Sequence, residues 1–187
     1  MVFGDDVDLA LQAAVALANS AESPETLRSI DDLDAFWDHY GYTGRHDGDQ
    51  QELDAVSAIR PALRALLIAD RDRAVDQVNE ILSRYRAVPR LVRHGDTDWH
   101  LHAIDDDAPL ADRIMVETAM AMIDVIRADD MSRLSVCADA GCEGVVVDHR
   151  SVVNVLTWRQ ATMPGDPFGP GDTVLVKTPV GFDGAVW

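Results

Sequence analysis

Cysteine is scarce in this 187-residue sequence, which contains only Cys137 and Cys142. Two cysteines cannot form the disulfide framework of a small secreted protein, so we expect a reducing compartment. No apolar run approaches the ~20 residues that span a bilayer. The first residues are acidic where a signal peptide would be basic. The sequence therefore predicts a cytoplasmic protein with no membrane partner.

Lysine is almost absent. The sequence has 16 basic residues against 33 acidic ones, a formal net charge of −17, and Lys177 is the single lysine. Affinity for nucleic acid comes largely from Lys and Arg side chains that neutralise phosphates. We therefore expect no autonomous DNA binding.

Catalytic signatures are also missing. The sequence has no glycine-rich phosphate loop, no nucleophile elbow and no HExxH motif. We expect a protein that is not an enzyme, while noting that catalytic groups can converge from distant positions.

Helical periodicity dominates the first two thirds of the chain. One helix is expected between a Ser29 N-cap and a Gly41 stop, with Leu33, Phe36, Trp37 and Tyr40 on one face. A proline, Pro61, should kink or restart the helix that contains it. The other predicted helices cover residues 6–20, 50–68, 71–86 and a methionine-rich segment at 109–128.

Alternating patterns predict two small β-structures. Residues 90–94 and 98–104 flank a polar turn and indicate a β-hairpin. The stretches RLSVC and GVVVD are typical of short strands around the two cysteines. We predict a mainly α-helical fold with a small β-hairpin, divided into a helical domain at 1–130, a zinc-ribbon-like knuckle at 131–160 and a Pro/Gly-rich irregular tail at 161–187.

Several segments together resemble a known family. They are ALANS, SIDDLDAFW, AIRPALRALL, QVNEILSRY and, from Arg133, RLSVCADAGCEGVVVDHRS. In this order they resemble the bacterial putative stress-induced transcription regulators (the ABATE domain) that carry a C-terminal CGNR-type zinc finger. The resemblance implies a helical ABATE domain, DNA binding by the family, and a finger that begins at Cys137 and Cys142.

The sequence departs from that family after Asp148. It has neither the third and fourth cysteines nor the Cys-Gly-Asn-Arg motif, and Arg133, Arg150 and Arg159 are balanced by nearby acids. Four ligands are usual for a structural zinc. The remaining candidates are Cys137, Cys142 and His149, so zinc is a possible cofactor, and the alternative is a vestigial knuckle with two reduced thiols.

Two further sets of residues are candidates for ligand binding. His100 and His102 lie on one face of the predicted strand and could hold a metal, or simply form a polar surface. Arg60 and Arg64 lie one helical turn apart and could bind an anion, or pair with acids such as Asp54 and Asp70.

These features support three hypotheses about function. The first is a stress-related transcription regulator or sensor without autonomous DNA binding. The second is a protein-interaction or small-ligand module that has lost its zinc finger, and a homodimer is possible. The third is a metal-dependent enzyme that uses His100 and His102. In the sensor hypothesis, Met and aromatic side chains line a pocket with an arginine or histidine at its mouth, for a small acidic or amphipathic ligand.

Overall fold

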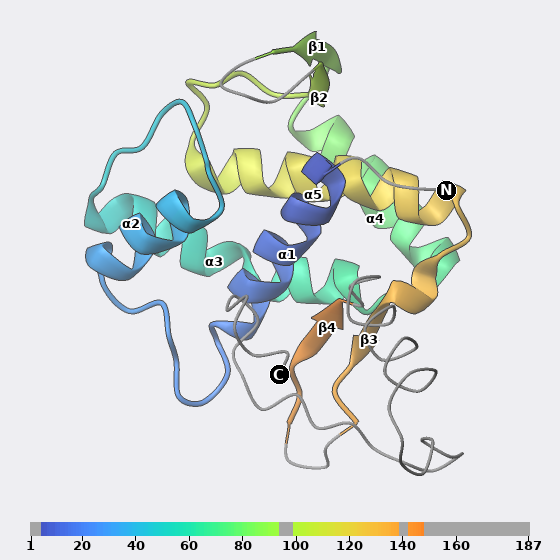
Figure 1. Cartoon of the computed structure of the whole chain (residues 1–187), viewed down its shortest axis with the longest axis horizontal. Helices are drawn as coiled ribbons and strands as arrows, with labels where there is room; N and C mark the ends of the chain where they lie inside the picture. Colours follow the sequence, from blue (N-terminus) through green and yellow to red (C-terminus); the bar gives the residue numbers. More distant parts are fainter. Residues whose placement is uncertain (1–4, 94–98, 139–141, 148–187) are drawn as a thin grey trace, which may run out of the picture. The chain divides into compact units, whose positions relative to one another are not determined.

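Five helices and two small antiparallel sheets make up the fold (Figure 1). The computed structural model describes residues 5–93, 99–138 and 142–147. The helices are α1 (Asp5–Asn19), α2 (Ile30–His39), α3 (Gln50–Leu67), α4 (Arg71–Arg84) and α5 (Leu110–Arg127). The mainly helical fold predicted from the sequence is confirmed.

The two sheets are hairpins at opposite ends of the helical bundle (Figure 1). In the first, β1 (Arg90–Val92) pairs with β2 (His100–His102), and Leu91 lies opposite Leu101. In the second, β3 (Leu134–Val136) follows a short 3-10 helix, η1 (Met131–Arg133), and pairs with β4 (Val145–Val147). Both predicted pairs of strands are therefore present.

The chain divides into two units after Val147. The β3–β4 hairpin thus belongs to the same compact unit as the five helices, whereas the sequence predicted a boundary near residue 130. The predicted tail at 161–187 lies outside the described residues. No described helix is long and apolar enough to cross a membrane.

Local side-chain chemistry explains where the helices begin and end. At the start of α2, the Ser29 hydroxyl accepts from the Asp32 backbone N–H, while the Asp32 carboxylate accepts from the Ser29 N–H. Asp49 and Asp70 cap α3 and α4, and each carboxylate accepts from the backbone N–H three residues later. Gly41 follows α2 with a φ of 63°, a left-handed conformation that glycine adopts without strain.

Of the two outcomes predicted for Pro61, a kink or a restart, the restart is wrong, because helix α3 continues through this residue. A proline within a helix leaves the carbonyl four residues earlier without its usual N–H donor. Here that carbonyl belongs to Ser57, and the Arg60 Nε donates to it at 3.1 Å. The arginine side chain thus satisfies the acceptor that the proline leaves unpaired.

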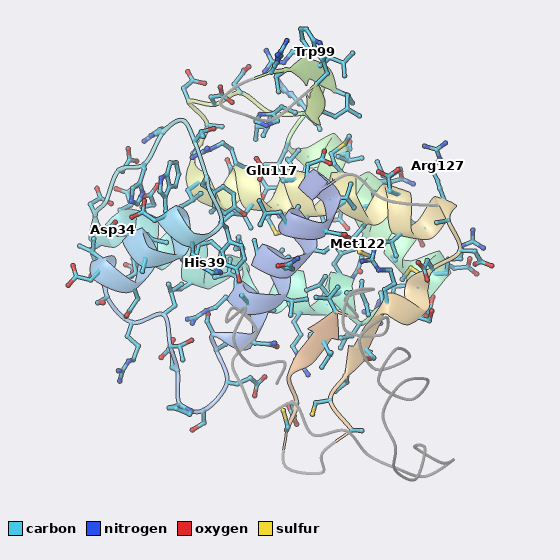
Figure 2. The ribbon with its side chains drawn as sticks, viewed as in Figure 1. Asp34, His39, Trp99, Glu117, Met122 and Arg127 are labelled. Atoms are coloured by element: carbon cyan, nitrogen blue, oxygen red, sulfur yellow. The ribbon has the colours of Figure 1, made fainter. Side chains whose placement is uncertain are left out.

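The hydrophobic core lies between α1, α3, α4 and α5. Helix α5 contributes more residues to it than any other element, among them Met115 and Met122, and Met122 is labelled in Figure 2. Both methionines are buried and belong to the core. Met120, in contrast, is only partly buried, and its surroundings lead to the candidate site.

Candidate functional site

A cavity of about 270 Å³ lies where α1, the loop after α2, strand β2 and α5 meet. Its apolar lining comes from all four elements, and its polar lining is dominated by ionisable groups. The apolar side chains belong to Val7, Leu9, Ala10, Ala13, Leu101, Ala103, Met120 and Ala121, with Tyr40 and Tyr42 as the aromatic members. The ionisable ones belong to Asp6, His102, Arg113, Glu117 and Asp124.

Glu117 is the unusual acid of this cavity. Figure 2 shows it on α5, on the side of the β1–β2 hairpin. Removal from water raises the pKa of its carboxyl group to about 7, and nearby Asp106 adds to this rise, while Arg113 opposes it. Among the described residues, no side chain or backbone group forms a hydrogen bond or ion pair with the carboxyl group of Glu117. The cavity therefore has a carboxyl group that is partly protonated at neutral pH and is available to form a hydrogen bond or an ion pair with a ligand.

Arg113 lies one helical turn before Glu117 and is 3% exposed. Its guanidinium donates to three backbone carbonyls, those of Thr43, Arg45 and Ala108. It also lies over the Trp37 ring, 5.1 Å from the centroid. Because its donors are engaged, Arg113 fixes the loop after α2 to α5 and has little capacity left for a ligand.

That loop is held by a second polar cluster around His46. Both ring nitrogens of His46 face carboxylates, at 2.8 Å from Glu52 and 2.7 Å from Asp34. The ring stacks on Trp37 with centroids 4.5 Å apart. Glu52 is buried and also accepts from the backbone N–H groups of Asp47 and Gly48. These contacts order residues 42–49.

Tyr42 is the residue that this ordered loop places in the cavity wall. Burial raises the pKa of its hydroxyl well above the usual value, and the nearby Glu117 acts in the same direction. Tyr40, which is buried, also has a pKa raised by burial. Both phenols therefore stay neutral at physiological pH and act as hydrogen-bonding groups.

The family model described as "ABATE: Putative stress-induced transcription regulator" matches residues 11–129. The chain belongs to the ABATE family. The matched residues include most of the cavity wall and end before the two cysteines, so the finger is not part of the match. A 45-residue stretch, 24% of the chain, is 47% identical to part of a mycosubtilin synthase polypeptide of Bacillus subtilis, and it spans 2% of that protein.

Of the residues predicted to bind a ligand in this ABATE domain, His102 lines the cavity. Its Nδ1 lies 3.4 Å from an Asp106 carboxylate oxygen. His100 is on the same strand, opposite Val92. Within the described ranges, no three His, Cys, Asp or Glu side chains are grouped to hold a metal ion.

Arg60 and Arg64 lie elsewhere, beside the loop that follows α1. Arg60 pairs with Glu25 at 2.8 Å, and Arg64 lies 3.7 Å from Glu22. Neither lines the cavity. Their acidic neighbours come from residues 22–25 and not from Asp54 or Asp70, and anion binding by the pair stays a prediction.

The cysteines lie in the turn region between β3 and β4. Cys137 is partly buried and Cys142 is exposed, and neither is in a disulfide. The Cys137 N–H donates to the Gly144 carbonyl at 2.8 Å, and the Gly144 N–H lies 3.4 Å from the Cys142 sulfur. His149 lies outside the described residues, so zinc at this knuckle stays a prediction.

Two long-range contacts attach this hairpin to α1. The Asn19 side-chain amide donates to the Val145 carbonyl at 2.8 Å and accepts from the Val145 N–H at 2.7 Å. Arg133, which is 6% exposed, pairs with Asp8 at 2.8 Å. The hairpin is thus bound to the last residue of α1, and η1, which directly precedes β3, is bound to the first half of α1.

Arg113 and Glu117 were not predicted as site residues. A signal was present, because these two charged residues lie four positions apart among the apolar and methionine residues at 114–122. Such a pair projects from one face of a helix. Charged residues are seldom buried without a reason, so this face was a candidate site.

Proposed function

We propose that this ABATE-family chain is a regulatory sensor, in which a small molecule enters the cavity and α1 carries the effect to the β3–β4 hairpin. The proposal rests on α1, because this helix contributes residues both to the cavity wall and to the contacts with the β3–β4 hairpin. Its residues Val7, Ala10 and Ala13 contribute to the cavity wall, and its last residue, Asn19, binds β4. A ligand that shifts α1 would therefore change the hairpin contacts directly.

Charge supports a regulator that does not bind DNA by itself. The net charge is −17, and Arg133, the one described arginine of the finger region, is buried against Asp8. A buried, paired guanidinium cannot neutralise a phosphate. In this proposal the output of the sensor is an interaction with another protein, which supplies any contact with DNA.

A thermal-shift screen of metabolites tests the proposal. A compound at a hundred times its dissociation constant stabilises the folded state by about 2.7 kcal/mol. For a chain of this size, that is a rise in melting temperature of roughly 5–10 °C. Hydrogen exchange of the β3–β4 amides, with and without the compound, then reports whether the effect reaches the hairpin.

Two tryptophan variants make the screen specific. Ala10→Trp fills the cavity from α1, while Ala55→Trp places the same side chain on the exposed surface of α3. A true ligand stabilises wild type and Ala55→Trp but not Ala10→Trp. Stabilisation of all three proteins, or unchanged exchange in the hairpin, contradicts the proposal.

A second candidate function is protein interaction through the β1–β2 hairpin. Leu91 and Leu101 lie opposite each other and are 67% and 49% exposed, and Trp99 is 63% exposed (Figure 2). A surface of this kind suits a self-complementary contact with a second copy of the chain. Sedimentation velocity tests it: the wild type should be dimeric and Leu91→Asp monomeric, and a monomeric wild type removes this candidate.

A further inference from the structure

The cavity has an acidic character that limits what can bind in it. Its lining has three carboxyl groups, from Asp6 on α1 and from Glu117 and Asp124 on α5. Its one guanidinium, that of Arg113, already donates to three carbonyls. A ligand carboxylate would meet this acidic lining without a free cation to pair with. Of the two ligand classes that the sequence suggested, the lining disfavours the small acid.

Glu117 is the group that would gain most from a positively charged ligand. It lines the cavity without a hydrogen-bond or ion-pair partner among the described residues. A carboxylate removed from water is costly unless a counter-charge or donor reaches it. An ammonium or amidinium group in the cavity would supply both.

The exposed part of the cavity lining includes apolar side chains. Leu9 and Leu101 are 42% and 49% exposed, and both line the cavity together with the partly buried Met120. Exposed leucines at the rim of a cavity favour a ligand with a hydrocarbon body. The volume of about 270 Å³ is near the lower end of ligand pockets, so the body is small.

We propose that the cavity binds a small organic cation, an ammonium or amidinium on an apolar body, with its charge against the Glu117 carboxylate. This ligand class rests on the proposed sensor function and makes it specific. Ligand binding requires the ionised carboxylate, so Glu117 releases its proton to solvent when the cation binds. The complex then contains an ion pair in place of a neutral carboxyl group.

The charged and titratable groups that face Glu117 come from every surrounding element. They are Asp6 on α1, Tyr40 and Tyr42 after α2, His102 on β2, Asp106 in the following loop, and Arg113 and Asp124 on α5. Both tyrosines stay neutral below pH 8, because burial raises their pKa values. Histidines in general titrate between pH 5 and 8, so His102 needs its own control.

Calorimetric titration with three probes of one length tests the ligand class: hexylammonium, hexanoate and hexanol. Hexylammonium should bind the wild-type chain, and hexanoate should not. With a Glu117 pKa of about 7, the ionised fraction rises from about one in eleven at pH 6 to about ten in eleven at pH 8. The affinity for hexylammonium should therefore increase roughly tenfold over this range.

Variants assign the effect to Glu117. Glu117→Gln keeps the shape of the side chain and should lose both the affinity for hexylammonium and its pH dependence. Glu80→Gln, on the exposed surface of α4, should change neither. His102→Gln should keep the pH dependence if Glu117 is its source. Circular dichroism of each variant establishes that it is folded before the titration is interpreted.

The outcomes separate the ligand class from the proposed function. Any one of three results overturns the cation proposal. Hexanoate binds as tightly as hexylammonium or more tightly, hexylammonium does not bind, or Glu117→Gln binds hexylammonium as the wild type does. The sensor function survives those results if any compound from the metabolite screen still stabilises the wild type and fails with Ala10→Trp. If no compound of any charge distinguishes wild type from Ala10→Trp, the proposed function itself falls.

Discussion

Replacing Glu117 by glutamine should stabilise the protein at high pH and have a smaller effect at low pH. Burial raises the pKa of Glu117 from 4.5 to about 7, so the folded state resists its ionisation. Below the ordinary pKa of 4.5, which the group has in the unfolded chain, the neutral carboxyl group makes its full contribution to the free energy of unfolding. This contribution is lost as the pH rises through about 7. One pKa unit corresponds to about 1.36 kcal/mol, so the full loss is about 3 kcal/mol.

Urea unfolding of the whole chain, followed by tryptophan fluorescence, measures this effect. Between pH 5.5 and pH 8, the ionisation of Glu117 should lower the free energy of unfolding of the wild type by about 2 kcal/mol. Glu117→Gln should not show this decrease. The quantity to compare is the difference in unfolding free energy between the two proteins, because the other titrating groups then cancel. Glu80→Gln serves as the matched control and should follow the wild type at both pH values. If the Glu117→Gln difference is the same at pH 5.5 and pH 8, the carboxyl group is not desolvated and the description of the cavity is wrong.

Three further predictions follow from the hairpin contacts, the cysteines and the charge. Asn19→Ala should destabilise the fold by about 1–3 kcal/mol in urea unfolding, because Val145 loses two hydrogen bonds. The control, Asn79→Ala on the exposed face of α4, should have little effect. The melting temperature should be unchanged by EDTA, because the core lies in the helices; a large fall would reveal metal-linked folding. In gel-shift titrations at physiological salt the isolated chain should not bind duplex DNA, since its net charge is −17, and tight, salt-sensitive binding would contradict this.

Local chemistry explains which parts of the fold could be predicted from the sequence. The Ser29 N-cap and the Gly41 stop depend on residues within a few positions of each other, and both predictions are confirmed. The restart at Pro61 was wrong for an equally local reason. The proline does remove an N–H, but the neighbouring Arg60 side chain donates to the orphaned carbonyl, and composition alone does not reveal that contact.

The candidate site was only partly predictable. A cavity lined by Met and aromatic side chains, with an arginine or a histidine at its mouth, was expected, but the arginine in the lining is Arg113 and not Arg60 or Arg64. Helical spacing predicted that Arg60 and Arg64 lie on one face of their helix. It could not predict that a loop 35–42 residues earlier would place Glu22 and Glu25 beside this face. Desolvation of Glu117 depends on four elements packing together, so no local pattern determines its pKa.

The side chain of Asn19 also bears on how this protein avoids aggregation. Strand β4 consists of three consecutive valines, and a short apolar strand at the edge of a sheet is a template for another chain. The Asn19 amide occupies the Val145 N–H and carbonyl as a neighbouring strand would. That position of the edge is thereby closed to a strand from a second molecule. Loss of this one amide would expose a valine-rich edge, and we expect the first consequence in a cell to be insolubility.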